Sequence, residues 1–199
     1  MRKRLNSMLL AATLAAVASP LLLAQRAPAA TTPEERYPLN VAITYDATYA
    51  NVITGHHFWM QGGRVQVDGD FYRGLGVVAD VAGMHQSNIL SSGVPLSLVT
   101  ATFGPRFTLR PARKRSSFYG QALWGVAEGF NGLFPVDNQP HASSNSFAEQ
   151  LGGGMDVRLS PRVAVRVFQA DWLRTMLPNM TTNAQNIMHL GAGMVFRFR

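Results

Sequence analysis

The stretch from Val99 to Leu109 reads VTATFGPRFTL and alternates between two kinds of side chain. Its odd-numbered positions are apolar, whereas its even-numbered positions are threonine, glycine or arginine. Successive side chains of a β-strand point to opposite faces of the sheet, so the alternation indicates a strand with one apolar and one polar face. The same criterion identifies the other strands of the chain.

A period of two recurs through most of the chain, with Gly, Pro, Asn and Ser at the interruptions. Strands are expected near residues 41–49, 64–68, 75–82, 99–109, 117–128, 150–159, 163–171 and 188–198. Within 163–171 the phase changes, because Gln169 and Asp171 fall on the opposite parity to Arg166. A β-bulge near Val167 and Phe168 would place all three polar residues on one face. The alternative is that Gln169 and Asp171 lie beyond a membrane band.

The connections between these strands alternate between short and long. The short ones are residues 72–74, 111–116 and 160–162, and the long ones are residues 51–59, 86–95, 129–146 and 174–185. Membrane barrels of single bacterial chains have an even number of strands, short turns at one end and longer loops at the other. The sequence therefore predicts an all-β fold, an eight-stranded antiparallel up-and-down barrel with every short turn at one end.

The composition of the polar face favours a membrane barrel over a soluble one. The chain has only two lysines, Lys3 and Lys114, and charged residues make up 15% of it. A water-facing surface needs many Lys and Glu side chains, whereas small residues with scattered Arg and Asp suit a narrow lumen. The aromatic residues expected near strand ends, as in an interfacial girdle, are Tyr45, Tyr49, Phe58, Trp59, Trp124, Trp172 and Phe198. We therefore expect a transmembrane barrel, and the alternative is a soluble exported lipocalin-like binding barrel with an apolar interior.

The N-terminus has the three parts of a secretory signal peptide. A basic start is followed by an apolar run from Met8 to Leu23 and by the small-residue site Ala27-Pro28-Ala29. We expect residues 1–29 to be a cleaved signal peptide, with Ala24 as the alternative last residue removed. Residues 30–40 would then form a short periplasmic lead, and residues 41–199 the barrel.

Charge and cysteine usage exclude several classes of function. The signal peptide contains Arg2, Lys3, Arg4 and Arg26 and no acidic residue, so much of the net charge of +7 belongs to it. No basic helix or aromatic-basic platform remains, and we expect no nucleic-acid partner. The sequence has no cysteine, which excludes a disulfide framework, a thiol nucleophile, a Cys-ligated metal and a lipidated N-terminal cysteine.

Four stretches carry a family resemblance: FGPRF at 103–107, LGGGMDV at 151–157, VAVRVFQAD at 163–171 and GAGMVFRF at 191–198. In order and spacing they resemble the OmpA-like outer-membrane β-barrel family, and most closely a version common in acidobacterial genomes. The resemblance implies an eight-stranded barrel in the outer membrane of a Gram-negative bacterium, inserted by the barrel-assembly machinery. That machinery recognises a terminal aromatic residue in the last strand, which Phe198 matches, although Arg199 follows it.

Charged residues of both signs fall on the predicted interior. They are Asp46, Arg64, Asp68, Asp80, Arg106, Asp156, Arg158, Arg166, Asp171 and Arg197. Buried charges need partners, so we expect a network of ion pairs that fills the lumen, with His189 hydrogen-bonded to it. The alternative is a selective ion path, which would make the protein a minor pore for small solutes. The parity of the strands does not specify which arginine meets which aspartate.

The motif His85-Gln86-Ser87-Asn88 is the candidate for chemistry. It is similar to the motif of outer-membrane lipid A deacylases, in which a histidine acts as base for a serine nucleophile. In an extended chain His85 and Ser87 share one face, but no acidic partner is evident beyond Glu128 and Glu149. The plainer interpretation is a rim histidine followed by a polar turn.

The sequence leads to a non-enzymatic barrel protein of the cell outer membrane. We expect a role in membrane integrity or in surface interaction, to which the longest loop, residues 129–146, would contribute. The adjacent His56 and His57 point to opposite faces of a strand, so we expect no metal site, and we expect no cofactor. The expected partners are outer-membrane lipid, lipopolysaccharide and the assembly machinery, and the protein is expected to be a monomer.

Overall fold

The computed structural model describes residues 39–51, 56–89, 93–111, 115–136, 139–179 and 183–198. The predicted signal peptide (1–29) and residues 30–38 of the predicted lead lie outside the described residues. Leu39 and Asn40, which the sequence analysis assigned to the lead, already belong to the first strand. Among the described residues, no helix has the length and apolarity required to cross a membrane.

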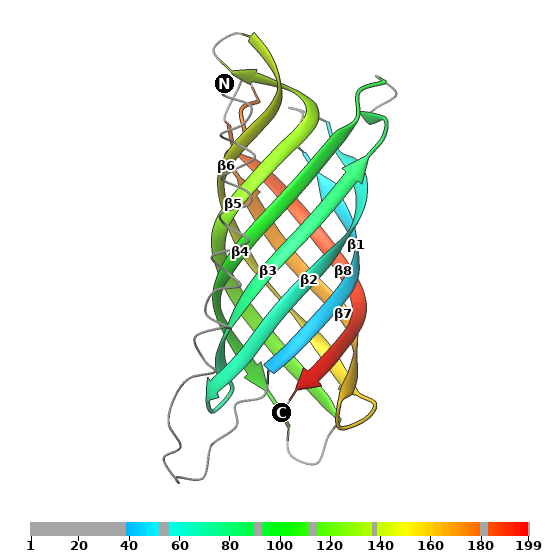
Figure 1. Ribbon diagram of the computed structural model, residues 1–199, viewed down its shortest axis with the longest axis vertical. Helices are drawn as coiled ribbons and strands as arrows, with labels where there is room; N and C mark the ends of the chain where they lie inside the picture. Colours follow the sequence, from blue (N-terminus) through cyan, green and yellow to red (C-terminus); the bar gives the residue numbers. More distant parts are fainter. Residues whose placement is uncertain are drawn as a thin grey trace, which may run out of the picture. The chain divides into compact units, whose positions relative to one another are not determined.

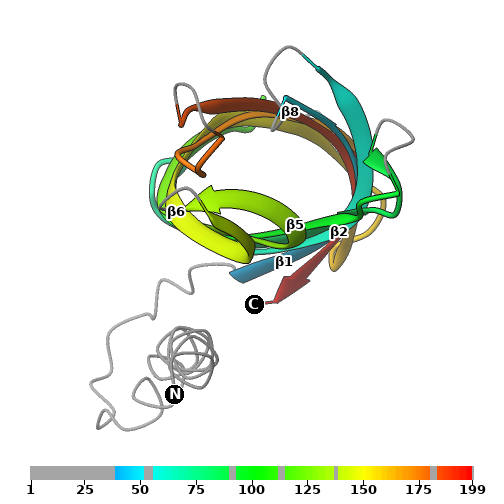
Figure 2. The same cartoon turned by 90° about the horizontal axis from the view of Figure 1, so that it is seen from above.

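Eight antiparallel strands form one closed barrel (Figures 1 and 2), as the sequence predicts. They are β1 (Leu39–Ala50), β2 (Phe58–Tyr72), β3 (Leu75–Gln86), β4 (Leu96–Leu109), β5 (Ser116–Val136), β6 (Gln139–Arg158), β7 (Val163–Thr175) and β8 (Gln185–Phe198). Each strand pairs with the next in sequence, and β8 pairs with β1, so that Tyr49 faces Met188 and Leu39 faces Phe198. Closure leaves no unpaired sheet edge.

The two ends of the barrel differ. At one end, here called the turn end, lie the short connections β2–β3, β4–β5 and β6–β7, the start of β1 and the end of β8 (Figure 1). The β2–β3 turn is the tightest, with positive φ at Arg73 (43°) and Gly74 (90°), as in a two-residue type I′ hairpin. The opposite end is called the loop end, and its connections β1–β2, β3–β4 and β7–β8 are longer. The predicted alternation of short and long connections is confirmed except between β5 and β6.

One predicted loop is a pair of strands. Residues 129–146 were expected to be the longest loop, but β5 continues to Val136 and β6 begins at Gln139, so the hairpin extends past the other strands. Phe130 pairs with Ser143 and Phe134 with His141, and the register shifts between these two pairs. The prediction was wrong because Gly, Asn, Pro and Ser suggest a loop, whereas the backbone groups here are satisfied by cross-strand pairing.

The phase change in β7 is a β-bulge, as predicted. Arg166 faces Gly193 and Gln169 faces Gly191 in β8, so two residues of β7 lie opposite one residue of β8. The two residues of the bulge, Val167 and Phe168, are both exposed on the outer face. The bulge thereby returns Arg166, Gln169 and Asp171 to the same inner face, where all three are buried.

The barrel has its charges inside and its large apolar side chains outside. Along β4 the exposed residues include Phe103, Phe107 and Leu109, whereas Thr102 and Arg106 are buried. Phe103 is 71% exposed, and Arg166 and Asp171 are both 0% exposed. This polarity is the reverse of a lipocalin-like barrel, which has an apolar interior and a polar exterior.

Candidate functional site

The candidate site is the polar network that fills the middle of the lumen. It is built around three guanidinium groups, those of Arg64 on β2, Arg106 on β4 and Arg166 on β7, each 2% exposed or less. The inward carboxylates Asp46, Asp68, Asp80, Asp156 and Asp171 are buried as well. The structure places these eight sequence-predicted residues inside the barrel, contributed by six strands that the closed sheet brings together.

Arg64 holds a cluster of three aspartates from three different strands. Its Nε lies 2.7 Å from Asp46 Oδ2, and its Nη1 contacts Asp171 and lies 3.5 Å from Asp80 Oδ2. Thr44 Oγ1 donates to Asp46 Oδ1 at 3.0 Å. One buried cation thus faces three buried carboxylates, which makes Arg64 the arginine that the largest number of carboxylates contact.

The other two arginines each have their own aspartate. Arg106 Nη1 lies 2.5 Å from Asp68 Oδ1, and Arg166 Nε lies 2.9 Å from Asp156 Oδ1. Asn40 Nδ2 also donates to Asp68, at 2.7 Å. Each guanidinium therefore has a carboxylate partner, as buried charges require.

Three glutamines join the ion pairs into one network. Gln66 accepts hydrogen bonds from Arg106 and Arg166 and donates to Asp80. Gln121 accepts from Arg106 Nε at 3.1 Å and donates to Asp171 Oδ1 at 3.0 Å. Gln169 accepts from Arg166 Nη1 at 2.8 Å and donates to Asp171. Because an amide both donates and accepts, each glutamine links a cation to an anion.

Tyr119 on β5 contacts two of the arginines, and it was not predicted from the sequence as part of the network. The guanidinium carbons of Arg106 and Arg166 lie 4.2 Å and 4.5 Å from the centroid of its ring. The ring is buried, and its hydroxyl has no hydrogen-bond partner among the described residues. Its parity with Ser117 and Gln121 on the inner face was the available signal.

Paired glycines make room for the network. A Cβ built on Gly152 would collide with the Asp171 carboxylate, and one on Gly154 would meet the Tyr119 ring. A Cβ on Gly191 would collide with Asp46. The glycines on the inner face therefore leave space, and large polar side chains from other strands occupy it.

We expect Tyr119→Leu to lower the free energy of unfolding by about 1–4 kcal/mol, because two buried cation–π contacts are lost. Tyr119→Phe keeps the ring and removes only a hydroxyl without a described partner, so its effect is expected to be small. Urea titration of the folded barrel, followed by tryptophan fluorescence, compares the two. Equal losses of stability in both variants would show that the hydroxyl, and not the contact of the ring with the arginines, stabilises the barrel.

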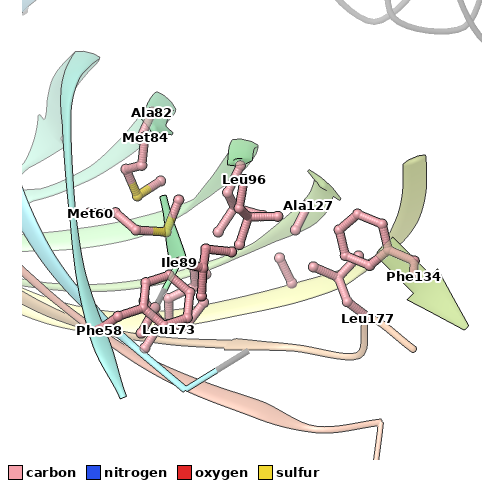
Figure 3. Close-up of a cluster of buried hydrophobic side chains, with 14 residues drawn as sticks. Phe58, Met60, Ala82, Met84, Ile89, Leu96, Ala127, Phe134, Leu173 and Leu177 are labelled. Carbon is pink, nitrogen blue, oxygen red and sulfur yellow. The ribbon is translucent and has the colours of Figure 1, made fainter. Parts of the chain in front are cut away.

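An apolar layer, here called the apolar cap, closes the lumen at the loop end (Figure 3). Its members are Ala50, Phe58, Met60, Ala82, Met84, Ile89, Leu96, Leu98, Ala127, Phe134, Ala148, Leu173, Leu177 and Ile187. They continue the inward parity of the polar residues, as Leu173 does after Asp171 and Met84 after Asp80. This layer was not predicted from the sequence, because the interior was assigned from the charged residues and the apolar residues on the same face were not included.

Two predicted interior residues lie elsewhere. Arg158 is exposed at the turn end, where β6 finishes, and Arg197 is half-buried near the end of β8. Both keep the inward parity, but the strands end there and water reaches the side chains. The prediction that they belong to the filled lumen is corrected: they lie at the turn-end rim.

The residues of the enzyme alternative, His85 and Ser87, make no described contact with each other. His85 Nδ1 lies 2.9 Å from the hydroxyl of Ser97, its register partner on β4, while Ser87 is exposed beyond the end of β3. Asn131 Nδ2 donates to the same Ser97 Oγ at 3.4 Å. The histidine is thus a rim residue that bonds across β3 and β4, and the pairing of His85 with Ser87 is replaced by a contact with Ser97.

The other histidines have structural neighbours. His189 is buried and lies 3.3 Å from Thr48 Oγ1 through its Nδ1, across the β1–β8 pair. The ring of His57 stacks on that of Tyr49, with centroids 5.1 Å apart and planes 6° apart. Among the described residues, no group of three or more His, Asp or Glu side chains is arranged to hold a metal ion.

No protein-family model matches the chain, and no curated protein matches its sequence. Solved structures do match. Neisserial surface protein A is 13% identical, with 80% of this chain and 97% of that chain covered and a TM-score of 0.62. The attachment invasion locus protein Ail of Yersinia pestis, solved with the heparin analogue sucrose octasulfate, is 17% identical, covers 81% and 99%, and has a TM-score of 0.55. These neighbours are eight-stranded outer-membrane β-barrels, and at such identities the likeness concerns the fold.

Proposed function

We propose that this chain is a structural or surface-interaction protein of the outer membrane, related to the OmpA-like barrels and without enzymatic activity. In this proposal residues 1–29 direct export and are removed, the barrel-assembly machinery inserts the chain, and the protein works as a monomer. The turn end faces the periplasm and the loop end faces the exterior, as in other barrels with short and long connections.

The observation that carries the proposal is the apolar outer surface. Large hydrophobic side chains are exposed on all eight strands, for example Ile43 on β1, Val77 on β3 and Leu190 on β8. A soluble protein rarely exposes an apolar patch of more than a few hundred Å², whereas a bilayer requires such a surface. Aromatic residues lie toward both ends of the strands, including Trp59 near the loop end and Phe198 at the turn end.

The loop end favours uncharged partners. In the sequence, the connections 51–57, 87–95 and 176–184 contain no charged residue, and the β5–β6 tip, residues 131–146, contains only Asp137. Most of their polar side chains are amides and hydroxyls, and Asn179 and Asn183 each accept a hydrogen bond from the other's backbone N–H. A sulfated ligand such as the one bound to Ail needs a basic cluster, which these loops lack. We therefore propose surface contacts through neutral hydrogen bonds.

Cysteine labelling in whole cells tests the placement, because the chain has no cysteine of its own. Ser143→Cys lies on the β5–β6 hairpin and Pro161→Cys in the β6–β7 turn, and both positions are exposed. A membrane-impermeant maleimide is expected to label Ser143→Cys on intact cells and Pro161→Cys only after the outer membrane is opened. Labelling of Pro161→Cys alone on intact cells would show that the orientation is the reverse of the one proposed. If neither variant were labelled after the outer membrane is opened, the result would contradict the proposal.

We expect planar bilayers containing the purified barrel to show no stable conductance. The middle of the lumen is crossed by the polar network, and the apolar cap covers it at the loop end. An interior of eight strands is only wide enough for side chains to fill. Discrete channel steps from wild type that disappear on boiling the sample would instead support the minor-pore interpretation.

We also expect no lipid A deacylation. Lipid A from cells that make wild type, Ser87→Ala or Ser97→Ala should give the same acyl-chain masses, because His85 bonds to the buried Ser97 and not to a free nucleophile. Mass spectrometry of extracted lipid A is the measurement. Loss of one acyl chain with wild type, abolished by either serine variant, would establish a hydrolase and identify its serine.

A further inference from the structure

A groove lies on the turn-end rim, between the β6–β7 turn and the end of β8. Its volume is about 510 Å³, and it is lined by Pro161, Arg162, Val163, Phe196, Arg197 and Phe198. Backbone pairing holds its walls together: Val163 pairs with Phe196, and Arg197 N donates to Arg162 O at 2.8 Å. Its size falls within the range of about 300–1,000 Å³ that is usual for small-molecule sites.

The groove is apolar on its outward side and basic beside it. Phe196 is 38% exposed and Phe198 54%, and both share the outward parity of the lipid-facing residues of β8. Arg162 is exposed in the turn. An acyl chain fits against the apolar side of the groove. A phosphate fits beside the arginine, because a guanidinium binds phosphate through parallel hydrogen bonds.

The turn end has arginines without carboxylate partners. Asp68, Asp70 and Asp156 are the described acidic residues nearest this end, and they already pair with Arg106, Arg110 and Arg166. By contrast, five further arginines of this end form no ion pair with any described residue. These are Arg73, Arg115, Arg158, Arg162 and Arg197.

Arg197 is half-buried, and the aspartates within electrostatic range of it, Asp156 and Asp68, are already paired with Arg166 and Arg106. An anion in the groove would give Arg197 a partner of its own. At the loop end, the basic residue of the described strand ends is Arg174, and Glu149 of β6 lies opposite it in the register. The described part of the loop end therefore has no comparable group of unpaired arginines.

We infer that this groove binds an anionic phospholipid of the periplasmic leaflet, with the phosphate at Arg162 and Arg197 and an acyl chain along Val163, Phe196 and Phe198. The inference rests on the proposed membrane placement with the turn end toward the periplasm. A barrel so bound is anchored at a defined depth, because headgroup and chain contacts are made by the same short segment of rim.

Native mass spectrometry of the purified barrel in detergent, with added dioleoylphosphatidylglycerol or dioleoylphosphatidylcholine, tests the inference. We expect phosphatidylglycerol to bind the wild type more than phosphatidylcholine, by about fivefold for each of the two arginines at the phosphate. Arg162→Gln is expected to lower this preference about fivefold. The matched control, Arg174→Gln, changes an exposed arginine at the loop end and should keep it.

Heat-modifiable mobility on SDS gels shows first that each variant is folded, which separates a failed lipid site from a failed membrane barrel. Equal binding of the two lipids by folded wild type would overturn the inference, as would equal losses in Arg162→Gln and Arg174→Gln. Displacement of phosphatidylglycerol by inorganic phosphate alone would show a phosphate site without acyl contacts and would also overturn it.

Discussion

Replacing Arg64 by leucine is expected to lower the free energy of unfolding of the barrel by about 3–5 kcal/mol, the cost of breaking a buried ion pair by removing one partner. Arg64 contacts Asp46, Asp80 and Asp171, and all four residues are buried. Without the guanidinium, three carboxylates face one another in the lumen. Native proteins are typically stable by about 5–15 kcal/mol, and a loss of this size is a large fraction of that range.

Two controls separate the charge from the size of the side chain. Arg64→Lys keeps a cation but loses the planar fork that reaches several carboxylates, so we expect an intermediate loss. Arg174→Leu removes an exposed arginine at the loop end and should leave stability within about 0.5 kcal/mol of wild type. Urea titrations in detergent micelles provide the comparison. If Arg64→Leu were as stable as wild type, the lumen would not be organised by this ion-pair cluster.

A second large effect is expected on the outer face. Val65 is 45% exposed at the middle of β2, and its register partners Ile43 and Val81 are exposed as well. Val65→Arg would place a cation against hydrocarbon at the middle of the bilayer, at a cost of about 2–4 kcal/mol. In a soluble barrel the same change would place a charge in water and have almost no cost.

The matched control is Leu109→Arg, at the turn-end limit of β4, where Leu109 is 56% exposed. Near the interface the expected cost is about 0–1 kcal/mol. Refolding of both variants into phospholipid vesicles, followed by urea titration, measures the difference between the two positions. Equal and negligible costs would mean that neither position faces lipid.

The strand pattern was predictable from the sequence because the constraint is strict and local. A strand with lipid on one side and a packed lumen on the other must alternate at every residue, so VTATFGPRFTL alone shows both faces. Even the bulge at Val167 and Phe168 was predictable, since three inward polar residues could not otherwise share a face. The closed order of eight strands follows from the alternation of short and long connections.

The rest of the lumen was harder to predict because it depends on residues far apart in sequence. The pairing of Arg64 with Asp171 joins β2 to β7, and nothing in either segment specifies the other. In the sequence Tyr119 is one more aromatic residue, and its role follows from the two arginines that lie over its ring. The β5–β6 hairpin has the composition of a loop, and its strands are recognised only through their mutual pairing.

The barrel has its charges inside and its apolar face outside, the arrangement that a bilayer requires. The measurement that tests it most directly is the mobility of the protein in the outer-membrane fraction on SDS gels, with unheated and boiled samples compared. We predict a band in that fraction whose mobility changes on boiling, because a closed barrel resists the detergent until it is heated. A protein found only in the soluble periplasmic fraction, with one mobility in both samples, would contradict the account.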